Sequence, residues 1–394
     1  MASGYPLDSL RASIPLLGEW TYLNTGTVGV MAEPVLNAHL ANLSHFERGG
    51  HTAQDAAIQV YEVARTTLAR LLSANPDDIA FNRNATDGIN TVAAAFPLQP
   101  GDEVITSSEE HPAMIIPWLA ACGRNDATLK YINVSNDPDA FVRNLKQEMS
   151  DRTRLVTISQ VSCETGVRMP VHLIREIVGP EVAILIDASQ SVGQFEVNIP
   201  ALQADFVIGN GHKWLAGPKG TGFIWLKPES IGLAPPVYFH SETVDPHWSR
   251  EYYQRTPAPN VKLSDRAERY EFGTRAWHLY GALTDAIEYL DAIGWEAIQT
   301  HVERISDYMK FQLAEIPGVR VHSPERWIDS SGLVTFSIEG FQGEDASARL
   351  WNEHKIAQRR VENPSAVRVS ATYFTSNEDV DQLTSKVDLL ARNG

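Results

Sequence analysis

The chain has 394 residues, of which 43% are hydrophobic and 21% are charged, a balance typical of a globular rather than a disordered protein. This length leaves room for two domains that share a cleft. The formal net charge of −16 argues against nucleic acid or an anionic membrane as the main partner, because both surfaces repel an acidic protein.

The N-terminal stretch MASGYPLDSL has no basic segment followed by an apolar one, so we do not expect a secretory signal. No apolar run is long enough to cross a bilayer. The two cysteines, Cys122 and Cys163, are too few for the disulfide framework of a secreted protein. These features indicate a soluble cytoplasmic protein.

Short β-rich runs alternate with amphipathic stretches between residues 79 and 226. This alternation predicts right-handed β-α-β crossovers, and therefore an α/β fold with a mostly parallel sheet and helices on both faces. The runs that we expect to form strands are DEVITS (102–107), TLKYINV (128–134), RLVTISQ (154–160), VAILID (182–187), DFVIG (205–209) and GFIWL (222–226). The stretches that we expect to form helices are 112–123, 138–150 and 171–178.

A loop rich in Pro, His, Tyr and Trp follows over residues 228–268, and loops of this length are usually functional. Beyond it we expect a smaller α+β unit. Its expected helices cover 276–293 and 295–316, two more lie closer to the C-terminus, and its expected strands are VRVHS (319–323), GLVTFSI (332–338) and VRVSA (367–371). We place the large domain at residues 20–272 and the small domain at 273–394, with residues 1–19 packing on the small domain.

Two charged residues follow neighbouring strands of the expected sheet. Asp187 ends the run VAILID, where an unpaired carboxylate is costly and a protonated heterocyclic nitrogen would keep it ionised. Lys213 lies one β-unit further on, among glycines in GHKWLAGPKGTG. A lysine amine opposite a carboxylate is what pyridoxal 5′-phosphate (PLP) demands, because the amine binds its aldehyde and the carboxylate keeps its ring nitrogen protonated. Taken singly, Asp187 could cap a helix and Lys213 could be an ordinary loop cation.

The phosphate of such a cofactor needs a site of its own. NATDGIN (84–90) opens an expected helix, so the backbone N–H groups near Ala85 and Thr86 form a natural anion site. A simple Thr or Asp cap of the helix is the alternative. GPKGTG lacks the Gly-Lys-Ser/Thr ending of a nucleotide P-loop, and its glycines are better explained by the turn behind Lys213.

These motifs, in this order, resemble the fold-type I PLP-dependent enzymes of the aminotransferase class V family. Within it they are most similar to the group of cysteine desulfurases, cysteine/cystine C–S lyases and isopenicillin N epimerase-like proteins. The resemblance runs from YLNTGTVG, near residue 22, to VRVSATYF, near residue 374, and includes SSEEHPA, DASQSVG, GHKWLAGPKGTG and RYEFGT. It implies PLP as the cofactor, a mostly parallel seven-stranded sheet in the large domain, and a smaller α+β C-terminal domain.

The resemblance assigns roles around the cofactor ring. It makes Lys213 the Schiff-base lysine and Asp187 the partner of the pyridine nitrogen. Gln190 would bond the phenolic oxygen of the cofactor, and His111 would stack on the ring face as an aromatic plane. Without the resemblance, His111 before a proline would be taken for an ordinary loop residue.

The resemblance also implies phosphate contacts from Asn210 and His212, although Asn210 departs from the Ser or Thr usual at its position. Thr274, in RYEFGT, is expected to reach the phosphate of a neighbouring subunit. This contact implies a homodimer with shared active sites. Without the resemblance, Thr274 would be interpreted as a helix cap.

Substrate recognition is expected from arginines. Arg368 lies in an otherwise apolar strand, where a lone charge is expensive and a bidentate grip on an amino-acid carboxylate is the natural use. The resemblance gives Arg368 this role and suggests Arg359 as a second contact, with Arg360 as its competitor because neighbouring strand residues face opposite ways. A surface charge is the other explanation for Arg359. Asn24 matches a position that lines the same pocket.

The reaction depends on the fate of sulfur. Cysteine desulfurases of this family pass sulfur to a cysteine in the C-terminal domain, and this chain has no cysteine after Cys163. We therefore predict a β-eliminating C–S lyase that acts on a cysteine S-conjugate or related amino acid and releases a thiol or persulfide, ammonia and a 2-oxo acid. The aromatic 228–268 loop favours a bulky substrate. Cys163 itself either lines the pocket or is a small buried hydrophobic residue.

Other functions stay open at this point. An aminotransferase, an epimerase or a decarboxylating oxidative deaminase acting on an amino-acid-derived biosynthetic intermediate would use the same residues. A catalytically silent binding protein could share the fold, although Lys213, Asp187 and Gln190 are all present. We expect no metal site, because the 12 histidines are scattered.

Overall fold

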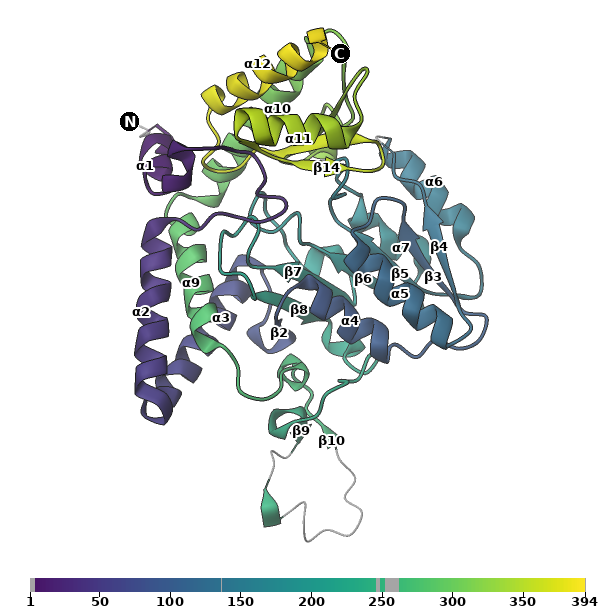
Figure 1. Ribbon diagram of the computed structural model, residues 1–394. Helices are drawn as coiled ribbons and strands as arrows, with labels where there is room; N and C mark the ends of the chain where they lie inside the picture. Colours follow the sequence, from purple (N-terminus) through teal and green to yellow (C-terminus); the bar gives the residue numbers. More distant parts are fainter. Residues whose placement is uncertain (1–3, 136, 246–248, 252–261, 394) are drawn as a thin grey trace.

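The computed structural model describes residues 4–135, 137–245, 249–251 and 262–393. A seven-stranded sheet of order β2-β8-β7-β6-β5-β3-β4 lies at its centre (Figure 1). The strands are β2 (Ile79–Asn82), β3 (Glu103–Ser107), β4 (Thr128–Ile132), β5 (Thr153–Ser159), β6 (Ala183–Asp187), β7 (Phe206–Asn210) and β8 (Gly222–Leu226). Only β8 runs antiparallel to its neighbours, β2 and β7. The α/β fold and the mostly parallel seven-stranded sheet are therefore confirmed.

Both faces of this sheet are covered. Every residue of β6 is buried, and the successive side chains Ile184 and Leu185 belong to different hydrophobic clusters. Successive strand residues point to opposite faces, so a strand buried on both sides has a continuous apolar sequence. The covering helices on this part of the chain are α4 (Ala85–Ala95), α5 (Pro112–Arg124), α6 (Pro138–Glu148) and α7 (Ile174–Val178).

A second, four-stranded antiparallel sheet of order β11-β12-β15-β14 lies toward the C-terminus, beside the helices drawn in yellow-green and yellow in Figure 1. Its strands are β11 (Val319–Val321), β12 (Leu333–Ile338), β14 (Arg359–Val361) and β15 (Ala366–Ser370), and its helices are α10 (Trp295–Ala314), α11 (Gly343–His354) and α12 (Asn377–Asn393). The smaller α+β unit expected from the sequence is confirmed.

Two segments near the expected domain boundaries pack on the unit to which the sequence did not assign them. Helix α9 (Trp277–Asp291) lies beside α2 (Glu33–Gly49) and α3 (Gln54–Leu71) rather than on the C-terminal sheet (Figure 1). Conversely, β1 (Thr21–Tyr22) pairs with β13 (Ile356–Ala357). The boundaries at residues 20 and 272 stay a prediction.

The N-terminal helix α1 (Leu7–Ala12) contacts the C-terminal unit. Arg11 donates to the carboxylate of Asp379, with 2.5 Å between Nη1 and Oδ2, and the Tyr5 hydroxyl donates to the carbonyl oxygen of Tyr373.

The predicted loop over 228–268 contains a short hairpin, β9 (Val244–Asp245) with β10 (Lys262–Leu263). Residues 246–248 and 252–261 of that loop lie outside the described residues. None of the helices formed by the described residues combines the length and the apolarity needed to span a bilayer.

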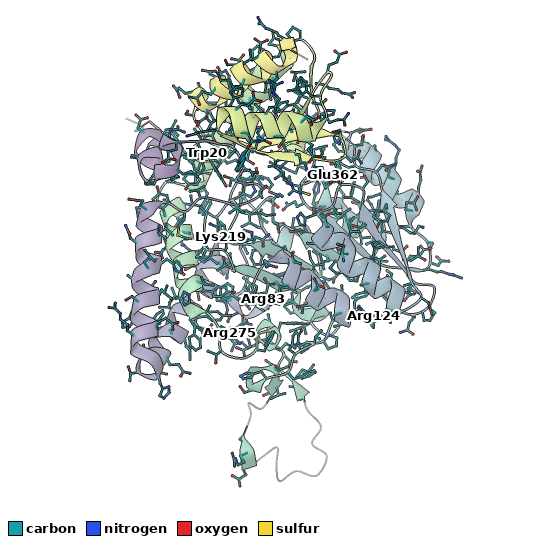
Figure 2. The ribbon with its side chains drawn as sticks, in the orientation of Figure 1. Trp20, Arg83, Arg124, Lys219, Arg275 and Glu362 are labelled. Carbon is teal, nitrogen blue, oxygen red and sulfur yellow. The ribbon has the colours of Figure 1, made fainter. Side chains whose placement is uncertain are left out.

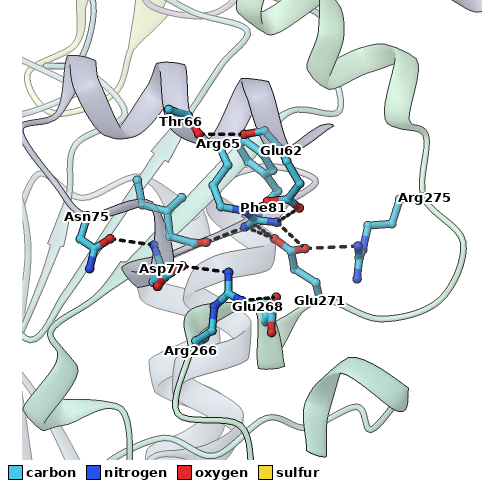
Figure 3. A network of polar contacts seen from close by, with 11 residues as sticks. Glu62, Arg65, Thr66, Asn75, Asp77, Phe81, Arg266, Glu268, Glu271 and Arg275 are labelled. Atoms are coloured by element: carbon cyan, nitrogen blue, oxygen red, sulfur yellow. Dashed lines mark hydrogen bonds and ion pairs between the residues drawn. The ribbon is translucent and has the colours of Figure 1, made fainter. Parts of the chain in front are cut away.

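A buried ion network fixes the β2 edge of the central sheet (Figure 3). Arg65, on α3, donates to both carboxylate oxygens of Glu271, at 2.7 and 3.1 Å, and to the carbonyl oxygen of Ile79 at 2.6 Å. Glu271 also accepts from the backbone N–H of Phe81 at 2.6 Å and pairs with Arg275 at 3.2 Å. The side chains of Arg65 and Glu271 are only 4% and 1% exposed. Arg65 has a second, half-exposed partner in Glu62, at 3.0 Å, but Glu271 is its only buried anion among the described residues.

Glu271→Ala should therefore strongly destabilise the fold, because it removes the buried anion of Arg65 and leaves the guanidinium only the half-exposed Glu62. We expect the free energy of unfolding to fall by about 3–5 kcal/mol, measured by urea denaturation. The matched control is Arg70→Ala on the same helix, whose pair with Asp291 is exposed at 61% and 40%. It should cost about 1 kcal/mol at most. Equal urea midpoints for the two variants would contradict the importance of the network.

Candidate active site

A cavity of about 210 Å³ lies at the carboxyl ends of β5, β6 and β7, where ligands gather in parallel sheets. All residues predicted to hold the cofactor line it, except Thr274. The lining residues are Thr27, Asn84, Ala85, Thr86, His111, Ala113, Ser159, Cys163, Asp187, Ser189, Gln190, Asn210, His212 and Lys213. The structure thus brings together side chains from segments far apart in the sequence; their binding roles remain proposals.

Lys213 and Asp187 both belong to this cavity. Burial lowers the pKa of the Lys213 amine, although the negative charge of Asp187 acts in the opposite direction. A lowered pKa leaves more of the amine neutral, which is the nucleophilic form. Asp187 is 7% exposed, and its Oδ1 accepts from the backbone N–H of Ser189 at 2.8 Å.

The N-terminal segment around Gly29 packs against the backbone of Lys213. The backbone N–H of Gly29 donates to the carbonyl oxygen of His212 at 2.8 Å, and a Cβ at position 29 would collide with the carbonyl oxygen of Lys213. Only glycine permits this close approach. The sequence analysis missed this contact and missed Thr27 as a lining residue, although the glycines of TGTVG were a signal for both.

His111 caps α5, with Pro112 in the first helical position. Its Nδ1 accepts from the backbone N–H of Ala113 at 3.1 Å, so the neutral ring carries its proton on Nε2. Burial, assisted by the positive charge of Lys213, lowers the pKa of His111 to about 4. The imidazole is therefore neutral at neutral pH.

Gln190 is held at both ends of its amide. Its Oε1 accepts from the indole N–H of Trp214 at 2.9 Å, and its Nε2 donates to the carbonyl oxygen of Gly26 at 2.8 Å. Both contacts fix the amide orientation and use one of the two hydrogens on Nε2. The other hydrogen can serve a ligand oxygen.

The predicted phosphate site differs in one respect from expectation. The side-chain Oδ1 of Asn210 accepts from the backbone N–H of Ala85 at 2.8 Å, so this amide is already bonded. The backbone N–H of Thr86 has no hydrogen-bond acceptor among the described residues. It is therefore the N–H at this helix terminus that is free to bind an anion. Because Asn is longer than the usual Ser or Thr, its amide spans the gap to α4. Nδ1 of His212 is likewise buried without a partner among the described residues, which fits an anionic ligand group beside it.

Arg368 is fully buried, and no carboxylate of the described residues pairs with it. It donates through Nη2 to the hydroxyl of Thr27 at 3.0 Å and through Nη1 to the carbonyl oxygen of Cys163, while Nε has no partner within the described chain. Burial lowers the pKa of Arg368 to about 10, so it is still charged at neutral pH. A buried guanidinium without an anionic partner is electrostatically costly.

Strand alternation separates Arg359 from Arg360. Arg359 is the register partner of Arg368, and its positive charge lowers the pKa of Arg368. Arg360 points to the other side of β14 and pairs with Glu344 on α11 at 2.5 Å. Of the two, only Arg359 is therefore on the side of Arg368. Asn24 has a buried Oδ1 without a partner among the described residues, as a pocket-lining amide would.

Two further predicted residues have different surroundings. Thr274 lines a separate cavity of about 380 Å³ together with Arg83 and Arg275, which are labelled in Figure 2. Cys163 lines the cavity of Lys213, and burial raises the pKa of its thiol to about 12. Cys163 is therefore both a pocket-lining residue and a small buried one, so the two explanations given for it are compatible. No group of three or more His, Cys, Asp or Glu side chains that could hold a metal occurs in the described part of the chain.

The family model for aminotransferase class-V matches residues 31–383. The chain belongs to this family. A probable cysteine desulfurase of Staphylococcus aureus (strain COL) is 30% identical over 355 residues, which cover 86% of this chain and 83% of that protein.

Solved structures agree. A mutant of C-DES with glycine covalently linked to the PLP cofactor has a TM-score of 0.87 at 25% identity, covering 96% of this chain and 98% of that one. The complex between the cystine C–S lyase C-DES and its reaction product cysteine persulfide has a TM-score of 0.86 at 24% identity, covering 95% and 99%.

This class-V protein is a PLP-dependent lyase, and the sequence predictions of family, fold and cofactor are confirmed. The residues of the cavity fit the cofactor chemically. Lys213 supplies an amine, Asp187 a carboxylate, and His212 and Thr86 supply polar atoms without partners in the described chain.

The ring of His111 should stay neutral down to about pH 5, because its lowered pKa lies near 4. Between about pH 6.5 and 4 the unfolded chain binds this proton and the folded chain does not, so stability falls as the pH falls through that window. NMR titration of histidine-labelled protein, with His111→Gln to assign the resonance, measures the value. The chain in concentrated urea is the control, and a folded-state midpoint near about 6.5 would contradict the burial argument.

Proposed function

We propose that this class-V enzyme is a β-eliminating C–S lyase acting on a cysteine S-conjugate or a related amino acid. Its products are a thiol or persulfide, ammonia and a 2-oxo acid. The observation that carries the proposal is the buried Arg368, which has no carboxylate partner in the described chain and lies beside a cavity that contains Lys213 and Asp187. A site of this kind suits an amino-acid carboxylate next to a PLP amine.

When bound, PLP supplies an aldehyde for amine exchange and a ring that accepts the electron pair of the broken Cα–H bond. Lys213 would bind the aldehyde and, after displacement by the substrate amine, take the Cα proton as general base. Its lowered pKa suits this role, since the neutral amine is the base. Asp187 would hold the proton on the ring nitrogen, while the neutral His111 covers one ring face.

Arg368 would orient the substrate. Its guanidinium already donates to Thr27 and to the Cys163 carbonyl oxygen, so its plane is fixed before a ligand arrives. A carboxylate gripped there loses little further freedom on binding, which is the advantage of a preorganised fork. We propose Arg359 and Asn24 as the neighbouring contacts of the substrate.

The surroundings of Cys163 support release of sulfur rather than its transfer to the protein. The thiolate is the nucleophilic form of cysteine, and the raised pKa of Cys163 keeps the thiol protonated at neutral pH. The sequence has no cysteine after it. A cleaved thiol or persulfide would therefore leave with solvent, and this favours a lyase over a desulfurase that uses a protein cysteine.

We further propose a homodimer with shared sites in the cytoplasm. Phe272, which lines the cavity that contains Thr274, belongs to a group of exposed apolar side chains, and groups of this kind mark interaction surfaces. The group also includes Val237, Tyr238 and Phe239, and the rings of Tyr238 and Phe272 contact each other at a tilt, with centroids 4.6 Å apart. In this arrangement Thr274 would contact the phosphate of the neighbouring subunit.

A panel of cysteine S-conjugates should release thiol and 2-oxo acid in equal amounts, with no amino-group transfer to an added 2-oxo acid. Lys213→Ala is the control: it should lack the visible absorbance of lysine-linked PLP and lose activity by about 10³-fold or more, since both the linkage and the general base are removed. Transamination without thiol release would overturn the lyase proposal. Near wild-type turnover by Lys213→Ala would overturn the assignment of the lysine.

Arg368→Met keeps the length of the side chain and removes its charge. We expect kcat/KM for the amino-acid substrate to fall about 100-fold, as for loss of a buried charge-assisted hydrogen-bond pair, with PLP absorbance retained. Arg360→Met is the matched control from the adjacent strand and should change kcat/KM by about twofold at most, since its exposed pair with Glu344 contributes little. Equal losses in both variants would contradict the role of Arg368.

A further inference from the structure

Glu110 is a buried carboxylate that the proposed reaction does not use. It is 7% exposed, and its Oε1 accepts from the hydroxyl of Ser107 at 2.7 Å and from the backbone N–H of Ser159 at 2.9 Å. Its Oε2 accepts from the hydroxyl of Ser159 at 2.5 Å. The two serines are the last residues of β3 and β5, so one carboxylate connects the ends of two strands.

These strand ends are not joined by the sheet itself. The pairing of β3 with β5 runs from Glu103 only as far as Ile105, which lies opposite Val156. Beyond that point the N–H of Ser159 has no strand partner and is buried, and a buried N–H without an acceptor is costly. The Glu110 carboxylate takes the place of the missing ladder bonds.

The position of this link relates it to the cofactor site. Glu110 directly precedes His111, and Ser159 both lines the cavity and pairs with Asp187 in the parallel register of β5 and β6. Glu110 itself does not line the cavity, and its oxygens face the two serines. It therefore acts through other residues and does not touch the ligand.

The charge environment argues against a simple structural ion pair. No cation of the described residues forms an ion pair with Glu110, unlike Glu271 at the other edge of the sheet. Burial, with a smaller contribution from the charge of Asp187, raises the pKa of Glu110 to about 7. Burying the Glu110 carboxylate without a cation costs free energy. We therefore infer that its hydrogen bonds to Ser107 and Ser159 have a role that offsets this cost.

We propose that Glu110 is a positioning residue that ties the end of β5 to the turn after β3 and thereby holds His111 and Asp187 in place around the cofactor ring. The inference rests on the placement of PLP given under the proposed function. Without the link, the turn that carries His111 could separate from the strand end beside Asp187. The stacking of His111 on the cofactor ring and the contact of Asp187 with the ring nitrogen would then no longer be held at a fixed relative position.

The test compares Glu110→Ala with Glu110→Gln in the full-length protein. Gln keeps Oε1 as acceptor for Ser107 and for the Ser159 N–H, and its Nε2 can donate to the Ser159 hydroxyl after that hydroxyl rotates. Ala removes all three contacts. Each variant is freed of cofactor and titrated with PLP, following the Kd by absorbance and the visible circular dichroism of the bound ring, which reports how the ring is held.

We expect Glu110→Ala to raise the Kd for PLP about tenfold or more and to lose most of the visible dichroism, and Glu110→Gln to stay within about threefold with the dichroism retained. Glu109→Gln is the matched control, because its carboxylate accepts from Ser162 and Thr165 instead, and it should leave both readouts unchanged. Wild-type Kd and dichroism in Glu110→Ala would overturn the inference. So would a Gln variant as impaired as the Ala variant, because the effect would then come from charge.

Should Glu110→Ala fail to fold, Ser107→Ala replaces it, since this change removes only the bond to β3. We then expect about a threefold rise in Kd and a weaker dichroism band, and unchanged values would overturn the inference. Absence of any lysine-linked PLP band in the wild-type protein would instead overturn the proposed function, so the two failures are distinguishable.

Discussion

Two basic side chains lie around the active-site cavity: Lys213, which follows β7, and Arg368 on β15, which contacts the lining residues Thr27 and Cys163. Arg368 is buried without a carboxylate partner in the described chain, and burial depresses the pKa of Lys213 although Asp187 opposes it. A buried charge is tolerated only when something neutralises it. In the proposed function an anionic ligand is the missing partner, and the free energy of its binding would include relief of an electrostatic cost already present in the protein.

The Arg65–Glu271 network shows what the same chemistry looks like when it is structural. There the Glu271 carboxylate accepts two hydrogen bonds from Arg65 and one from the backbone N–H of Phe81, and it pairs with Arg275 (Figure 3). The buried charges are therefore compensated within the protein. Both sites bury a guanidinium to nearly the same degree. The difference in compensation, rather than burial, separates Arg65, which stabilises the fold, from Arg368, for which we propose a role in ligand binding.

The N-terminal segment connects the two halves of the site. The N–H of Gly26 donates to the Ser370 hydroxyl in β15, its carbonyl oxygen accepts from Gln190, and Gly29 packs on the backbone beside Lys213. Thr27, between these two glycines, bonds Arg368. The proposed substrate-binding arginine and the lysine are thus held by one short stretch, which makes their separation a property of the fold and not of flexible side chains.

Much of this protein was determined locally and could be predicted from the sequence. The six named strand runs match β3 to β8 within two residues. Five of these strands are largely buried and have continuous apolar sequences, whereas the edge strand β4 is only partly buried and was recognised from its β-rich residues. The four-residue edge strand β2 was not named, since it is too short for such a signal and is fixed by pairing with β8. Lys213 and Asp187 were predicted because each follows a strong strand signal.

Tertiary structure decided what depends on distances between remote segments. Whether Arg359 or Arg360 lies on the side of Arg368 followed from the register of β14 with β15, and the loss of the Ala85 amide to Asn210 followed from the gap between β7 and α4. The role of Glu110 depends on where the pairing of β3 and β5 stops. Periodicity encodes which residues are buried, but which donor satisfies which buried acceptor is set only when the chain has packed.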